Sequence, residues 1–218
     1  MANSITYSNG KDFGEKLLRK LTRAAARGLN WLSRGYIHPN DITIFVLLMH
    51  LPIAVLIGTN HLLWAAGLLI IFSLLDTLDG ELARLQEKVS DVGGLLDAVS
   101  MRMKELCIYS GLIYLLSTTN QAPYFLLATM VACGAALITP FINTKGEAII
   151  ATYGHELSYD RLSRMFGRGL VPYEVRIVAI IIGLILGMHI LLWVMVGLAV
   201  LTTFTMLERL VSIIRGMR

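Results

Sequence analysis

The chain has 218 residues, of which 56% are hydrophobic and 16% are charged, and its mean hydropathy is +0.66. This composition excludes a soluble globular domain of this size and indicates a single membrane domain. The formal net charge of +4 is compatible with nucleic acid, but in a membrane protein it more often reflects loops that face anionic lipid headgroups or phosphorylated substrates. We therefore expect membrane lipids around the protein and no nucleic-acid partner. Cys107 and Cys133 both lie within apolar segments, so we interpret them as packing residues rather than as a disulfide.

Residues 1–41 are expected to form a polar N-terminus and a juxtamembrane amphipathic helix. Between Lys11 and Ser33, apolar residues recur near helical spacing and basic residues occupy the other faces. A basic amphipathic helix directly before a membrane span is typical of a helix that lies in the membrane interface. Docking of the same helix onto a protein partner is the alternative interpretation.

Six apolar segments follow, and each is close to the ~20 residues that the hydrocarbon core of a bilayer requires. They lie at about 42–58, 62–82, 93–117, 123–144, 172–189 and 190–214. The predicted fold class is an all-α integral membrane protein with six transmembrane helices, preceded by the interfacial amphipathic helix, and residues 42–218 form its membrane domain. If both termini are cytoplasmic, all 19 basic residues lie on the cytoplasmic side, in agreement with the positive-inside rule. We expect a multi-pass protein of the cell membrane whose termini and active site face the cytoplasm.

Three carboxylates lie at the edges of these apolar segments. Asp76 and Asp79 are spaced i, i+3 and therefore share one face of a helix, whereas Asp97 lies at the start of the next helical segment. A carboxylate beside hydrocarbon is costly unless it is paired, hydrated or bound to a metal ion. Two adjacent helix ends would aim these three side chains at one point, which predicts a site for a hard cation such as Mg²⁺ or Mn²⁺.

The spacing Asp76-x2-Asp79-Gly80-x2-Ala83-Arg84-x8-Gly93-x3-Asp97-x3 resembles the signature of the CDP-alcohol phosphatidyltransferase family. In that family a CDP-activated lipid donates its phosphoryl-linked group to an acceptor hydroxyl, and CMP leaves. The resemblance implies that the three carboxylates bind the metal ions and that the chain is an enzyme of phospholipid biosynthesis, working as a homodimer.

The resemblance also implies a binding site for the CDP moiety. The residues that it assigns to this site are Gly80, Ala83, Arg84, Gly93, Asn40 and Thr43. Gly93 is expected to allow close packing between the second and third spans. Asn40 and Thr43 belong to a Pro-Asn-x-x-Thr segment, which is similar to one found before the first span in the family.

The fourth Asp of the family signature is replaced by Met101, which changes the expected mechanism. In the family that Asp is taken as the base for the attacking hydroxyl, whereas a thioether has no titratable proton and is a weak ligand. One interpretation is an impaired enzyme that binds a CDP-lipid and turns over poorly. In another, Glu105, one helical turn further on, substitutes for that Asp through water, so that Asp97 and Glu105 are the candidate catalytic residues. In a third, metal assistance suffices without a base, at a cost of roughly 10²–10⁴ in rate.

Basic residues on the same side of the membrane are candidates for binding the acceptor. Lys145, Arg164 and Arg176 would suit an acceptor that carries its own phosphate, such as inositol phosphate or glycerol phosphate. Arg102, directly after the motif, is similar to the ending of the motif in the inositol-phosphate branch. Two other functions stay open, namely a CDP-lipid-binding protein of the same fold without turnover and a cation transporter.

Overall fold

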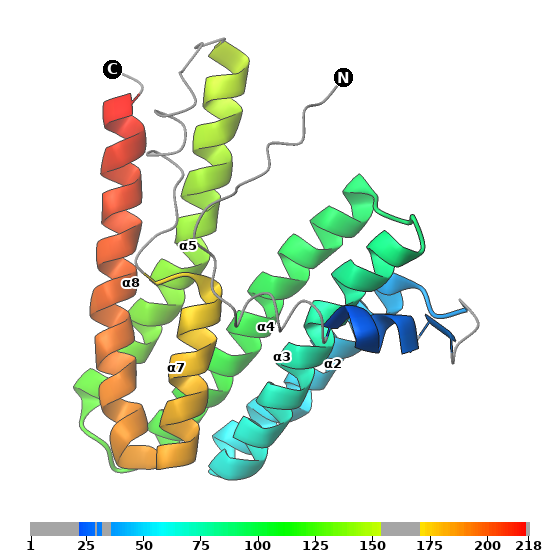
Figure 1. The fold of residues 1–218 in the computed structure, drawn as a ribbon. Coiled ribbons are helices and arrows are strands. Elements are labelled where there is room, and N and C mark those ends of the chain that lie inside the picture. The colour runs from blue at the N-terminus through cyan, green and yellow to red at the C-terminus, as the bar shows by residue number, and fades with distance from the viewer. Residues whose placement is uncertain (1–21, 29, 32–35, 154–170, 217–218) are drawn as a thin grey trace. The chain divides into compact units, whose positions relative to one another are not determined.

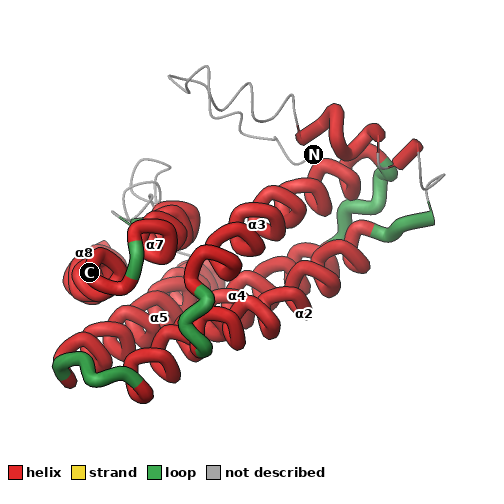
Figure 2. The backbone as a smooth tube through the Cα atoms, turned by 90° about the horizontal axis from the view of Figure 1, so that it is seen from below, coloured by secondary structure: helices red, strands yellow, loops and turns green. Residues whose placement is uncertain are grey.

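The computed structural model describes residues 22–28, 30–31, 36–153 and 171–216, and all regular structure within these ranges is helical (Figures 1 and 2). The predicted all-α class is confirmed for this part of the chain. The helices are α2 (Pro39–Gly58), α3 (Leu62–Leu85), α4 (Asp91–Thr118), α5 (Pro123–Tyr153), α7 (Tyr173–Leu186) and α8 (Met188–Gly216).

Several of these helices have the length and composition of membrane spans. Among the described residues, four segments are long and apolar enough to cross a bilayer, and they are Pro39–Gly58, Leu62–Leu85, Pro123–Ile149 and Met188–Arg215. α7 has 14 residues, and at 1.5 Å per residue it is about 21 Å long, shorter than a hydrocarbon core of about 30 Å. α4 carries charged residues through its first half. The chain is thus a multi-pass membrane protein, and the count of six spans stays a prediction.

The chain divides into two compact units, which we describe separately. Unit 1 comprises Met1–Leu48 and Ile71–Ser100. Its apolar core is formed by buried side chains from the beginning of α2 and the end of α3, namely Ile42, Val46 and Leu82, with Ile37, Phe72 and Leu75 packed against them. These contacts fix the start of α2 beside the end of α3.

The described part of the N-terminal region also belongs to unit 1. Residues 22–28 are helical, and Ala26 on this helix is fully buried. At the end of α3, the Gln86 Nε2 donates hydrogen bonds to Asn30 Oδ1 (2.9 Å) and to the carbonyl of Ile37 (3.0 Å). The N-terminal segment is therefore held against the end of α3, and the remaining residues of the predicted interfacial helix lie outside the described ranges.

Unit 2 comprises Met49–Ile70 and Met101–Arg218. Within it α5 and α8 lie side by side, and α7 turns into α8 at Gly187, whose φ of 92° suits glycine (Figure 1). This turn places the boundary between the last two apolar segments at Gly187, two residues before the expected position. The second half of α4 passes close to α2, because a Cβ added at Gly111 would lie 2.5 Å from the carbonyl oxygen of Ala54.

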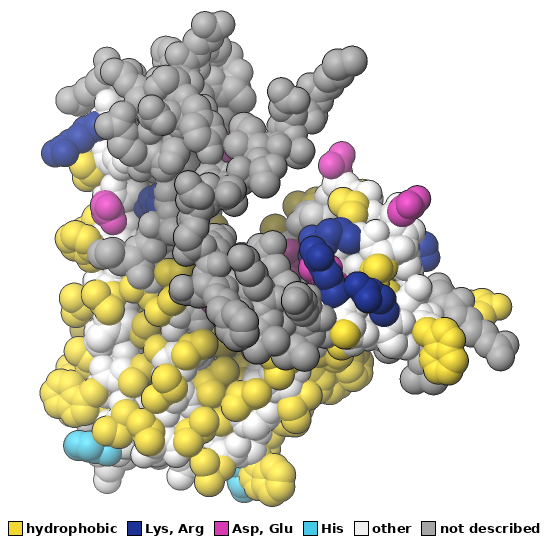
Figure 3. All heavy atoms as spheres, in the orientation of Figure 1, with side chains coloured by type: hydrophobic (Ala, Val, Ile, Leu, Met, Phe, Trp, Pro, Cys, Tyr) yellow, Lys and Arg dark blue, Asp and Glu magenta, His cyan; other side chains and the backbone are white. Residues whose placement is uncertain are grey.

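The outer surface of unit 2 is apolar. Large hydrophobic side chains of α8 are exposed, among them Trp193, Val200 and Phe204, and Figure 3 shows hydrophobic side chains over much of the visible surface of this unit. Exposed apolar area of this extent is expected where helices face lipid.

Candidate functional site

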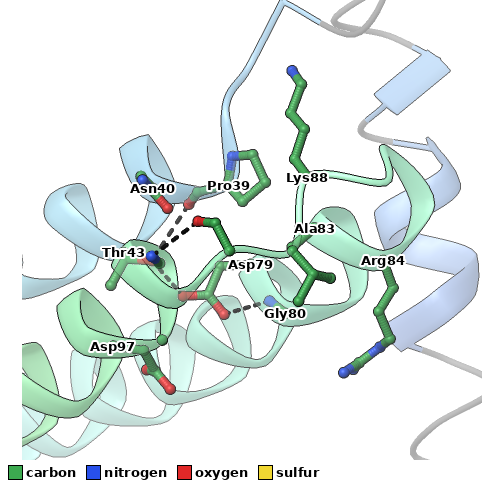
Figure 4. A pocket seen from close by; sticks show the side chains of 13 residues that line it. Pro39, Asn40, Thr43, Asp79, Gly80, Ala83, Arg84, Lys88 and Asp97 are labelled. Carbon is green, nitrogen blue, oxygen red and sulfur yellow. Dashed lines mark hydrogen bonds between the residues drawn. The ribbon is translucent and has the colours of Figure 1, made fainter. Parts of the chain in front are cut away.

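A cavity of about 180 Å³ lies within unit 1, where α2 begins, α3 ends and α4 begins (Figure 4). The residues that line it are Pro39, Asn40, Thr43, Asp79, Gly80, Ala83, Arg84, Lys88, Val89, Ser90, Gly93, Gly94 and Asp97. Three segments separated in sequence thus contribute to one small cavity, which is lined by both polar and apolar residues.

The structure brings together most of the residues that the sequence assigns to the site. All six residues assigned to the CDP moiety line the cavity, and so do two of the three predicted metal ligands, Asp79 and Asp97. Asp76, the third, does not line the wall of the cavity, but its charge acts on Asp79 from the same helix. The predicted site is therefore one place in the fold, with Asp76 beside it.

Asp79 is constrained by hydrogen bonds to both of its carboxylate oxygens. Its Oδ2 accepts a hydrogen bond of 2.6 Å from Thr43 Oγ1 on α2, and its Oδ1 accepts one of 2.6 Å from the backbone N–H of Gly80. Figure 4 shows Thr43 and Asp79 facing each other across the start of α2 and the end of α3. These bonds orient the carboxylate, while the negative charges of Asp76 and Asp97 both oppose its own charge.

The donor chemistry of this site fits a hard divalent cation. Carboxylate oxygens are the ligands that Mg²⁺ and Mn²⁺ prefer, and a cation would relieve the repulsion between the three like charges. Within the part of the chain that the structure describes, however, no three His, Cys, Asp or Glu side chains already form a metal-binding group. The three carboxylates would have to draw closer to share an ion.

Gly93 marks a close approach between α4 and α2. A Cβ at this position would lie 3.2 Å from Ser90 Oγ and 3.4 Å from Asn40 Oδ1, both of them cavity residues. From the sequence, Gly93 is expected to pack between the second and third spans. The neighbour in the structure is instead Asn40 at the start of the first, because the first turn of α4 faces the first turn of α2.

Glu81 holds two arginines beside the cavity. Its Oε1 accepts a hydrogen bond of 2.8 Å from an Nη of Arg84, and its Oε2 accepts one of 3.3 Å from Nε of Arg23 in the N-terminal helix. The side chain of Glu81 is 11% exposed, whereas those of Arg84 and Arg23 are 60% and 54% exposed. Figure 3 shows basic side chains gathered on the visible face of unit 1.

A second group of charged residues lies in unit 2. The Glu105 side chain, 1% exposed, accepts hydrogen bonds from Arg176 Nε (2.7 Å) and from an Nη of Arg102 (2.8 Å). Arg176 is 7% exposed and also donates to the carbonyl of Val171 at 2.9 Å. This is a buried ion cluster in which one carboxylate serves two guanidinium groups.

The cluster bears on the predicted roles of Met101 and Glu105. Arg102 donates weakly to the Met101 sulfur at 3.1 Å, and both oxygens of Glu105 are engaged by arginines. Turning Glu105 toward another proton donor would break a buried ion pair, which typically costs about 3–5 kcal/mol. The arrangement supports a structural role for Glu105 more than a role as substitute base.

The structure describes two of the three predicted acceptor-binding residues, Arg176 and Lys145. Arg176 is paired with Glu105, as above. Lys145 is exposed on α5, with its Nζ 5.9 Å from the ring centre of Phe141. Arg164 lies outside the described residues.

The sequence reasoning missed several residues at the cavity. Lys88 and Ser90 line it, and Ser90 Oγ accepts a hydrogen bond of 3.1 Å from the N–H of Gly93. Both residues lie in the polar connection before the predicted third span, and this position could have indicated that they lie near the site. The pairing of Glu81 with Arg84 was also readable as an i, i+3 contact, but its pairing with Arg23, 58 residues away, was not.

Comparison with known proteins relates this fold to a family of membrane enzymes. The profile of the family described as CDP-alcohol phosphatidyltransferase matches residues 36–205. The chain is 31% identical over 112 residues to the phosphatidylinositol phosphate synthase of Corynebacterium glutamicum, covering 50% of this chain and 51% of that protein. The chain spans between about half and two thirds of the length of the curated relatives that it matches first.

Solved crystal structures share the fold. The phosphatidylinositol phosphate synthase of Mycobacterium tuberculosis with CDP-DAG bound matches with a TM-score of 0.74 at 22% identity, over 89% of this chain and 94% of that chain. The same synthase in complex with manganese and citrate matches with a TM-score of 0.73 at 22% identity, over 88% of each chain.

Proposed function

Because the chain belongs to the CDP-alcohol phosphatidyltransferase family, we propose that it transfers a phosphatidyl-type group from a CDP-lipid to an alcohol and releases CMP. One observation carries the proposal. The six residues assigned to the CDP moiety and two of the three carboxylates, which are spread from Asn40 to Asp97 in sequence, line a single cavity. The related structures are described as binding CDP-DAG and manganese, which agrees with a CDP-lipid donor and a divalent cation here.

The cavity residues have chemistry suited to a pyrophosphate. Asp76, Asp79 and Asp97 would hold Mg²⁺ or Mn²⁺, which would neutralise the charge of the pyrophosphate. Arg84 offers a planar guanidinium that pairs well with phosphate oxygens. Gly80 and Gly93 leave the backbone open for close approach. In the transfer, the acceptor oxygen bonds to the lipid-linked phosphorus, the bond from this phosphorus to the bridging oxygen breaks, and CMP leaves with that oxygen.

The residue that would accept the proton of the attacking hydroxyl is in question at this site. Met101 stands where the family has its fourth Asp, and Glu105 is held by Arg102 and Arg176. We infer that transfer is slow, by roughly 10²–10⁴ relative to a site with a dedicated base. The same two observations favour, as a second candidate function, a protein that holds a CDP-lipid without turnover.

The acceptor is proposed to be a phosphorylated polyol. The curated relatives are named phosphatidylinositol phosphate synthases, and inositol phosphate is therefore the first acceptor to test, with glycerol phosphate as the second. Arg176 would contribute to acceptor binding only by sharing its guanidinium with Glu105. A homodimer and a cytoplasmic orientation of the site remain part of the proposal, and the family assignment disfavours a cation transporter.

The test measures CMP release by the purified full-length protein in vesicles that contain CDP-diacylglycerol. Each vesicle sample receives Mn²⁺ or Mg²⁺ and either inositol phosphate, glycerol phosphate or no acceptor. We expect slow CMP release that requires the cation and one acceptor, and that is lost in Asp79→Asn. CDP-lipid binding without acceptor-dependent CMP release would establish the second candidate, and absence of both would reject the proposed function.

A further inference from the structure

We propose that Glu81 is a positioning residue that holds Arg84 at the wall of the cavity for recognition of the donor's pyrophosphate. The inference rests on the proposed function, because it takes the ligand of the cavity to be a cytidine diphosphate group. Glu81 itself does not line the cavity, so its effect on the ligand passes through Arg84.

Hydrogen bonds hold the Glu81 carboxylate in one position. Its carboxylate is nearly buried, and its two oxygens accept separate hydrogen bonds, from Arg84 at 2.8 Å and from Arg23 at 3.3 Å. Arg23 lies on the N-terminal helix, which is also fastened to the end of α3 through Gln86 and Asn30. One oxygen therefore anchors Glu81 to a second element, and the other is left to orient Arg84.

Arg84 needs such a support because most of its side chain is exposed. A long arginine side chain that is 60% exposed samples many rotamers, and ordering it on a ligand opposes binding. The bond to Glu81 removes part of that freedom in advance. It keeps an Nη of Arg84 near Gly80, 3.7 Å from where a Cβ of Gly80 would lie, and Gly80 is itself a residue of the cavity.

The charge of Glu81 has two opposite effects on pyrophosphate binding. It lowers the positive potential at Arg84, and it orders the Arg84 side chain. A carboxylate beside Arg84 reduces the positive potential that a pyrophosphate would meet. Arg23, however, pairs with the same carboxylate and compensates its charge. Two arginines share one Glu, so the group keeps one net positive charge, and the ordering of Arg84 is the remaining effect.

The experiment is a double-mutant cycle on CDP binding by the full-length protein in detergent with Mn²⁺, using wild type, Glu81→Gln, Arg84→Met and the double variant. Glu81→Gln keeps the shape of the side chain and removes its charge. We expect it to weaken CDP binding about threefold to fivefold, the upper part of the range for exposed charged pairs. In the Arg84→Met background the same change should have no further effect, because the two residues act as one unit.

Two further variants keep the test decisive. Arg23→Ala removes the other partner of Glu81 and should weaken CDP binding less than Glu81→Gln does, since the bond between Glu81 and Arg84 is kept. Glu81→Asp retains the charge but withdraws it by one methylene, and it replaces Glu81→Gln if thermal unfolding shows that the latter does not fold. It should weaken binding in the same direction.

Several results would overturn the inference. Unchanged or tighter CDP binding in Glu81→Gln would do so, as would an equal loss in the Arg84→Met background. A loss in Arg23→Ala as large as that in Glu81→Gln would assign the effect to the N-terminal helix instead. If wild type fails to bind CDP, the proposed function itself is rejected, and the inference with it.

Discussion

Asp79 is held from two sides, by a hydroxyl of α2 and by the backbone of its own helix, while two other carboxylates oppose its charge. A half-buried carboxylate in this setting depends on its donors, because an ionised group without hydrogen bonds is costly near hydrocarbon. We therefore expect the hydrogen bond from Thr43 to Asp79 to stabilise the folded protein.

Replacing Thr43 by Val keeps the shape of a buried side chain and removes the hydrogen bond to Asp79. We expect the free energy of unfolding to fall by about 1.5–3 kcal/mol, the value for a hydrogen bond to a charged group. Thr43→Ser keeps the hydroxyl and should lose clearly less. Denaturant unfolding in detergent micelles measures both variants, and equal losses would show that the bond contributes little.

Met101 supports a prediction about the rate of transfer. Restoring a carboxylate by Met101→Asp should raise acceptor-dependent CMP release, up to the roughly 10²–10⁴ that general-base catalysis supplies. Met101→Asn is the matched control, since it has a similar shape and cannot accept the proton at useful strength. Robust and equal rates in the wild type and in Met101→Asp would contradict the interpretation of an impaired enzyme.

Glu105 and Arg176 support a prediction about stability. Arg176→Met leaves Glu105 buried with one partner fewer and should lower the free energy of unfolding by about 3–5 kcal/mol. Adding Glu105→Gln should recover a substantial part of this loss, because the uncompensated charge is removed. Lys145→Ala, at an exposed position, is the control for loss of a positive charge. A loss in Arg176→Met no larger than in that control would argue against a structural ion pair.

At the scale of the helices, close packing in unit 2 depends on Gly111. A Cβ there would lie 2.5 Å from the carbonyl oxygen of Ala54 and 3.0 Å from its Cα, so Gly111→Ala forces α4 and α2 apart. We expect a loss of about 1–3 kcal/mol, typical of overpacking. Gly134→Ala on α5, with nothing within 4 Å of the added Cβ, should be neutral or slightly stabilising. Similar melting temperatures for the two variants would contradict this packing.

The predicted apolar segments agree with the helices except at polar ends and at one turn. α5 continues to Tyr153, beyond the expected end at 144, because hydropathy detects the apolar part of a helix and polar residues can prolong it. α7 ends at Leu186 rather than at 189, because Gly187 takes a positive φ that periodicity does not reveal.

The sequence predicted those residues of the candidate site that belong to a spaced motif. Thr43, Asp79 and Gly93 were assigned through resemblance to the family, and the structure places them around one cavity. The hydrogen bond between Glu81 and Arg23 joins residues 58 positions apart. No spacing rule connects such a pair, because only the packing of the N-terminal helix on α3 brings the two side chains together.

For the whole molecule, the central claim is that the cavity at Asp79 binds a CDP-lipid with a divalent cation, whatever the rate of turnover. A ligand that binds only the folded protein raises the free energy of unfolding by RT ln(1 + [L]/Kd), where [L] is the free ligand concentration. Binding can therefore be measured independently of the rate of CMP release.

The most direct measurement is the melting temperature of the full-length protein in detergent, with and without CDP-diacylglycerol and Mn²⁺, for wild type and Asp79→Asn. We predict that the wild type is stabilised when both ligands are present and that Asp79→Asn is not. At saturation near 100 times the dissociation constant, the stabilisation amounts to about 2.7 kcal/mol. Equal stabilisation of the two proteins, or none in the wild type, would contradict the assignment of this cavity.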